Sequence, residues 1–141
     1  MTIERLISDG SIHAFRATPG EIGRAMSIAR RDLALAESIL EESLDWSYSI
    51  AYNAVLQTSR AYMFHLGYRP SATESHKTTM EFLRLSVDEW LKGTVAYFDR
   101  VRVKRHRTLY DEAGLVTEKE ARQLLEKAGE FVDYVSEKLS G

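Results

Sequence analysis

The scarcity of helix-breaking residues constrains the fold of this chain more than any other feature. Its only prolines are Pro19 and Pro70, which leaves long uninterrupted stretches between and after them. The alternation of apolar and polar residues that marks half-buried strands is nearly absent, whereas apolar residues recur at spacings of three and four. We therefore expect a mostly helical chain.

Two sequence signals indicate where long helices begin. Thr18 and Glu21 form a capping box around Pro19, a residue favoured at the first position of a helix. The apolar stripe of the helix that starts there predicts that it runs to about Glu42. The segment 117–120, Thr-Glu-Lys-Glu, is a second capping box and opens the last helix of the chain.

Three more helices are expected between these two, at residues 45–66, 73–86 and 88–111. Gly67 should end the first of them, residues 68–71 should form a turn, and Thr73 should cap the second. Four substantial helices with short connections predict an all-α fold, an antiparallel up-and-down four-helix bundle with an extra short helix. Residues 1–17 should form an N-terminal arm or short helix, and residues 18–141 the bundle domain.

The composition excludes several kinds of chemistry. The 141 residues include no cysteine, which rules out disulfides, a thiol nucleophile and cysteine-ligated metal centres. His13 and His65 have no carboxylate or histidine partner at metal-ligand spacing, so we expect no metal ion and no cofactor. The first ten residues are too polar for a secretory signal, and no stretch reaches about 18 apolar residues. We therefore expect a cytoplasmic protein with no membrane partner.

A basic block interrupts an otherwise acidic chain. Residues 100–107, RVRVKRHR, hold five of the 19 Lys and Arg residues and none of the 21 Asp and Glu residues. The block carries +5 and the rest of the chain −7, within a net charge of −2. Such a block indicates an anionic partner, although a solvated helix face has the same composition.

The basic block places two arginines at positions of the apolar stripe of its helix. The stripe begins with Leu91, Val95 and Phe98 and continues at the same spacing to Arg102 and Arg105. An unpartnered charge is too costly to bury. These two arginines must therefore meet carboxylates, a second subunit or an anionic ligand.

Arg102, His106 and Tyr110 follow one another at intervals of four residues, beside Arg105 on one face of the same helix. This group suits phosphate chemistry, because arginine matches phosphate oxygens with a planar fork and histidine exchanges a proton near neutral pH. Tyrosine can donate a hydrogen bond or stack on a base. We therefore assign phosphate or nucleotide binding to Arg100, Arg102 and Arg105, and candidate catalytic roles to Arg105, His106 and Tyr110.

A purely structural interpretation of the arginines remains open beside the functional one. In that interpretation they pair with Asp99, Asp111 or Glu112, or with acidic residues of a neighbouring helix. Spacing alone does not decide between the two.

The remaining polar and aromatic candidates are expected to have structural roles. His76 is expected at the surface or as a capping residue near the start of a helix. The polar line on the central helix faces either the basic helix or solvent, of which we favour solvent; it consists of Asn53, Gln57 and Arg60. Four aromatic residues are expected in the core or at an interface: Trp46, Tyr48, Tyr52 and Tyr62.

Several short segments occur in an order that resembles the HEPN domain family over roughly residues 20–140. They are Ala-Tyr-Asn-Ala at 51–54, Gly-Tyr-Arg-Pro at 67–70, His76, Arg-His at 105–106, Tyr-Asp at 110–111 and Thr-Glu-Lys-Glu-Ala at 117–121. HEPN proteins are small helical proteins often found beside minimal nucleotidyltransferases in bacteria and archaea. The resemblance implies a homodimer with the arginine-bearing helix at its cleft. It also implies a nucleotidyltransferase partner, nucleotide or RNA binding, and a toxin–antitoxin-type system.

Many HEPN proteins resemble metal-independent endoribonucleases. Their motif is an arginine, a polar residue and then a histidine, with roughly four to six residues between arginine and histidine. Arg105 and His106 match its first two positions, and Tyr110 stands where the motif has histidine, while Arg100 and His106 match the count without the local pattern. The resemblance therefore implies a binding module, with an endoribonuclease that cleaves single-stranded RNA as the alternative.

Overall fold

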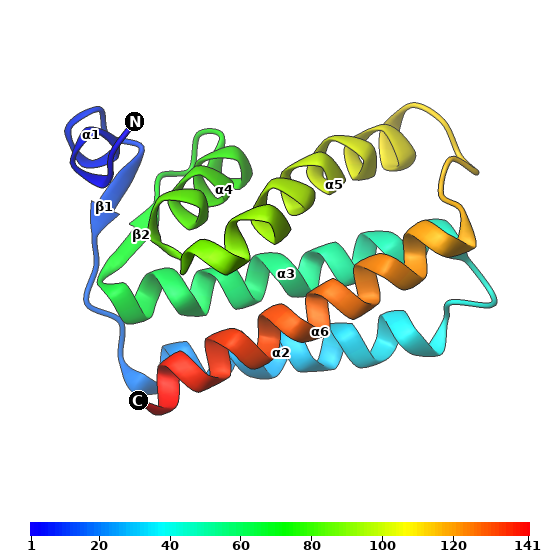
Figure 1. The fold of residues 1–141 in the computed structure, drawn as a ribbon, viewed down its shortest axis with the longest axis horizontal. Helices are drawn as coiled ribbons and strands as arrows, with labels where there is room; N and C mark the ends of the chain where they lie inside the picture. The colour runs from blue at the N-terminus through cyan, green and yellow to red at the C-terminus, as the bar shows by residue number, and fades with distance from the viewer.

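A computed structural model describes residues 1–141 as six α-helices, one 3₁₀ helix and a two-stranded sheet (Figure 1). The elements in chain order are α1 (Ile3–Ser8), β1 (Ile12–Ala14), α2 (Pro19–Ser38), α3 (Leu44–Leu66), β2 (Tyr68–Pro70), α4 (Ser75–Ser86), η1 (Glu89–Leu91), α5 (Lys92–Tyr110) and α6 (Glu118–Ser140). The all-α fold predicted from the sequence is confirmed, apart from the small sheet.

The long helices α2, α3, α5 and α6 alternate in direction along the chain, as in an up-and-down bundle (Figure 1). Helix α3 lies at the centre and packs against α2, α5 and α6. Helix α5 lies over α3 and α4, and touches α6 through Phe98 and Phe131, whose ring centroids are 5.4 Å apart. Of the basic block on α5, Arg102 and Arg105 face α3 and α4, whereas Lys104 pairs with Glu120 on α6.

The central position of α3 follows from its residue types. Large side chains such as Tyr52 and Met63 are fully buried on it, and so are the small residues Ala51, Ala54 and Ala61. Small residues let neighbouring helices approach closely, while the large ones fill the core between them. A helix that is apolar on several sides is the one that a bundle surrounds.

Three of the predicted helix ends are confirmed. Thr18 and Glu21 make a complete capping box on α2, and Thr117 and Glu120 make the same box on α6. Gly67 ends α3 in a left-handed conformation with φ of 95°, which costs glycine little.

Some predicted boundaries were wrong. Helix α2 ends at Ser38 instead of about Glu42, because residues 39–42 form a turn. Helix α4 begins at Ser75, since Glu74 adopts a left-handed conformation with φ of 51° that breaks the helix there. Thr73 therefore does not cap it.

The segment after Gly67, predicted as a turn, is strand β2. It pairs antiparallel with β1, Ile12 opposite Pro70 and Ala14 opposite Tyr68. Three-residue strands are too short to show an alternating pattern, which explains why the sequence did not reveal them. The pairing holds residues 1–14 against the bundle, with Leu6 and Ile12 buried in the common core. None of the helices is both long and apolar enough to cross a lipid bilayer.

Candidate functional site

Arg105 reaches from α5 toward the buried face of α3. Its guanidinium carbon lies 5.4 Å from the centroid of the Tyr52 ring. Its Nε atom is buried and donates to no acceptor, and no carboxylate lies within 4.0 Å of the side chain. The sequence therefore predicted correctly that Arg105 lies on the inner face of its helix. The charge of Arg105 is not neutralised within the chain.

Arg102 lies one turn earlier and is partnered. Its Nε donates to Oδ1 of Asp99 at 2.9 Å, and 27% of its side chain is exposed. The structural interpretation thus holds for Arg102 and fails for Arg105, while Asp111 and Glu112 form no ion pair with either arginine.

His76 joins these arginines from α4. Its ring stands edge-on to Tyr52, with 6.2 Å between the ring centroids. Partial burial and, after it, the charges of Arg105 and Arg102 lower the pKa of His76 below its usual 6.5. The side chain is nevertheless exposed near the start of α4, as the sequence predicted, and it is mostly neutral at pH 7.

Tyr52 forms the floor beneath these side chains. It is fully buried, and its hydroxyl has no hydrogen-bond partner. Burial raises the pKa of this phenol, so the hydroxyl keeps its proton. We call Tyr52, His76, Arg102 and Arg105 the arginine cluster. The sequence showed the two arginines but not the other two members, because His76 and Tyr52 come from other helices and only the packing of α3, α4 and α5 brings them together.

His106 and Tyr110 lie on a different side of α5. Their rings are 4.9 Å apart, and both side chains are exposed, Tyr110 by 71%. Neither forms a hydrogen bond with Arg102 or Arg105. The predicted catalytic group of Arg105, His106 and Tyr110 is therefore split, with Arg105 facing inward and the two rings facing outward.

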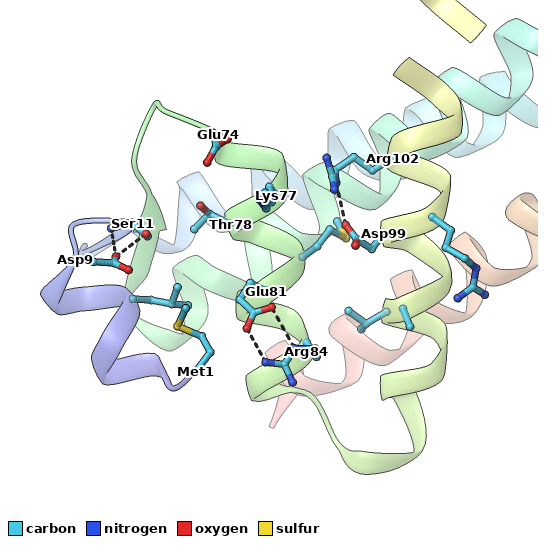
Figure 2. A pocket seen from close by; sticks show the side chains of 15 residues that line it. Met1, Asp9, Ser11, Glu74, Lys77, Thr78, Glu81, Arg84, Asp99 and Arg102 are labelled. Carbon is cyan, nitrogen blue, oxygen red and sulfur yellow. Dashed lines mark hydrogen bonds and ion pairs between the residues drawn. The ribbon is translucent and has the colours of Figure 1, made fainter. Parts of the chain in front are cut away.

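Arg100 and Arg102 contribute to the largest cavity, about 660 Å³, between α1, α4 and α5 (Figure 2). Its lining carries four basic and four acidic side chains: Lys77, Arg84, Arg100 and Arg102, with Asp9, Glu74, Glu81 and Asp99. Figure 2 shows Arg102 joined to Asp99 and, across the cavity, Arg84 joined to Glu81. These side-chain charges balance, and the amino terminus at Met1, which also lines the cavity, adds one positive charge.

Comparison with known families and structures agrees with this architecture. The family model of the HEPN domain matches residues 23–139. The chain belongs to the HEPN domain family. It is similar in fold to the crystal structure of TT1696 from Thermus thermophilus, with a TM-score of 0.65 and 20% sequence identity, over 83% of this chain and 97% of that chain. A comparison with curated proteins found no match.

The sequence favoured solvent exposure for the polar line on α3, but in this HEPN domain only part of the line faces solvent. Asn53 Nδ2 donates to Oδ2 of the buried Asp32 on α2 at 2.7 Å. Gln57 lines a cavity beside α4, and its Oε1 is buried without a donor. Of the three residues only Arg60 is exposed.

The arginine cluster of this HEPN domain can hold an anion. Arg105 supplies a charge without a carboxylate, Arg102 supplies a second guanidinium, and the neutral His76 can accept or donate one hydrogen bond. Planar guanidinium groups bind phosphate oxygens through paired N–H donors. The geometry therefore suits a phosphate group next to an imidazole.

Proposed function

We propose that this HEPN domain binds the phosphate of a nucleotide or of RNA at the arginine cluster. The observation that carries the proposal is Arg105, which is half-buried and has no carboxylate partner. An uncompensated charge at such a position destabilises the fold unless a partner arrives. A phosphate would compensate Arg105 directly and would share Arg102 with Asp99.

The proposal includes a homodimer and a minimal nucleotidyltransferase as partner in a toxin–antitoxin-type system, in the cytoplasm. The homodimer is supported by exposed apolar side chains on the outer side of α5, Val103 at 51% and Tyr110 at 71% exposure. The nucleotidyltransferase rests on membership of the HEPN family. Copurification with a nucleotidyltransferase encoded by the adjacent gene would support that pairing, and its absence would count against it.

Binding of labelled single-stranded RNA at low salt, followed by fluorescence anisotropy, tests the phosphate site. Arg105→Ala should weaken binding by roughly 10- to 100-fold, as expected for loss of hydrogen bonds to a charged group. Arg107→Ala is the matched control, because Arg107 is an exposed arginine on the same helix and in no ion pair. Equal losses of RNA affinity in the two variants would mean that binding depends only on non-specific charge. If the unaltered protein does not bind RNA, the proposed phosphate site is refuted.

The second candidate function is a metal-independent endoribonuclease acting on single-stranded RNA. It is favoured by the neutral imidazole of His76, which lies beside two guanidinium groups. A neutral imidazole can accept the proton of a ribose 2′-hydroxyl, while the arginines hold the phosphate. Cleavage in the presence of a chelator should then disappear in His76→Ala. Loss in His106→Ala instead would return the role to the exposed histidine, and intact RNA after incubation with the unaltered protein would refute the activity.

A further inference from the structure

Two arginines and two phenylalanines form a stack at the end of α3 near the sheet. Arg60 lies over the ring of Phe64, with 5.1 Å from its guanidinium carbon to the ring centroid. The Phe64 and Phe15 centroids are 5.0 Å apart with the ring planes tilted by 46°, and Arg69 lies 5.8 Å from the Phe15 centroid. Neither Arg60 nor Arg69 has a carboxylate within 4.0 Å.

The rings hold both guanidinium groups in place, and neither group forms an ion pair, although Glu21 lines a smaller cavity together with Arg60. A guanidinium over an aromatic face keeps its charge and its in-plane N–H donors. Its motion is already restricted, so a ligand that binds it loses less conformational entropy. Exposed arginines more commonly pair with carboxylates or move freely in water. This pair is instead pre-arranged for an anion from outside the chain.

A cavity of about 400 Å³ adjoins the stack and extends to α4. Arg60, Arg69 and His76 line it, and no Asp or Glu does. Its size is in the range of small-molecule sites. The cavity thus offers two cations and flat guanidinium faces.

His76 connects this cavity to the arginine cluster, because it lines the cavity and also faces Tyr52 and Arg105. A ligand that repeats an anionic group could place one anion at the arginine cluster and another beside Arg60 and Arg69. A planar group between the two anions could lie against a guanidinium face. Single-stranded RNA has this pattern, and its bases stack on arginine planes.

We infer that Arg60 and Arg69 form a second subsite that holds another nucleotide of a single-stranded RNA whose phosphate lies at the arginine cluster. The inference rests on the proposed phosphate binding at Arg105. It adds a place for the base and a second phosphate contact.

Fluorescence anisotropy with a short single-stranded RNA, over a series of salt concentrations, tests the subsite. The double variant Arg60→Ala/Arg69→Ala should bind at least roughly tenfold more weakly. The slope of log affinity against log salt should shrink by about 0.7 for each phosphate contact removed. Arg5→Ala/Arg30→Ala is the control with the same loss of charge, since both of its residues are exposed and lie outside the cavity. Circular dichroism verifies that each variant is folded.

The outcomes separate the subsite from the proposed phosphate site. If Arg105→Ala weakens binding and the Arg60/Arg69 double variant binds like its control, the subsite is refuted and the phosphate site stands. If only the Arg60/Arg69 double variant weakens binding, an RNA site exists at the stack, but the link to Arg105 is refuted. Weakening by both variants supports the inference, and no binding by the unaltered protein refutes both.

Discussion

Among single residues, Tyr52 carries a hydroxyl that the fold buries without a partner. Tyr52→Phe should leave the free energy of unfolding unchanged or raise it by up to about 1–3 kcal/mol, because an unsatisfied buried hydroxyl costs about that much. RNA affinity should stay unchanged, because the buried hydroxyl is out of reach of a ligand. Urea unfolding and anisotropy measure the two effects separately.

Tyr62→Phe provides the comparison for that variant. The Tyr62 hydroxyl donates to the carbonyl oxygen of Ser86 at 2.9 Å. Its removal should therefore lower the free energy of unfolding by about 1 kcal/mol. Equal losses of stability in the two variants would show that the Tyr52 hydroxyl has a partner after all.

His76 should make stability depend on pH. The pKa of His76 is lowered in the folded state from 6.5, chiefly by partial burial and next by Arg105. The unfolded chain therefore binds more protons between the two pKa values, and stability falls as the pH drops below 6.5. Thermal melting across this range should show the fall, and His76→Gln should flatten it. His13→Gln, at an exposed histidine on β1, should retain it. A fall that survives in His76→Gln belongs to another group.

The sequence could locate Arg102 and Arg105 on the inner stripe of α5 because helical spacing fixes the face that each residue occupies. It could not tell which of the two would be neutralised. Arg102 finds Asp99 at a local spacing, whereas the surroundings of Arg105 depend on how α5 crosses α3. The surface position of His76 was predicted correctly, but its contact with Tyr52 was not, since the two residues are distant in the chain.

Among the secondary-structure elements, the capped helices were the most predictable. Thr18 and Thr117 mark helix starts through local hydrogen bonds, which depend on a few adjacent residues. The start of α4 depends instead on the left-handed conformation of Glu74, for which the sequence carries no signal. The β1–β2 pair depends on a long-range contact between segments that have no strand pattern of their own.

The cap of α6 gives a stability prediction. Thr117 Oγ1 accepts from the N–H of Glu120 at 3.1 Å, and the Glu120 carboxylate accepts from the N–H of Thr117 at 3.0 Å. Thr117→Ala should lower the free energy of unfolding by about 1 kcal/mol, and Thr117→Ser should change it little. Urea unfolding measures both, and a serine variant as unstable as the alanine variant would mean that the cap is not the cause.

For the whole molecule, the proposed homodimer predicts a mass in solution of twice the 16.1 kDa of the chain. Val103→Glu should shift the protein to 16.1 kDa, because a carboxylate would be buried in the interface on α5. Analytical ultracentrifugation measures the change. Trp90→Glu is the control, since Trp90 is 68% exposed but lies in η1, outside α5. A monomeric unaltered protein would contradict the homodimer.

The single residue between α3 and β2 has a mechanical consequence. Gly67 alone joins the two elements, so Arg60 on α3 and Arg69 on β2 are held on directly connected segments. His76 belongs to α4, whose Met80 and Leu83 are buried in the same core. The cavity between them is therefore walled by elements of one core, and a strand bound across it would meet groups whose spacing the fold sets before binding.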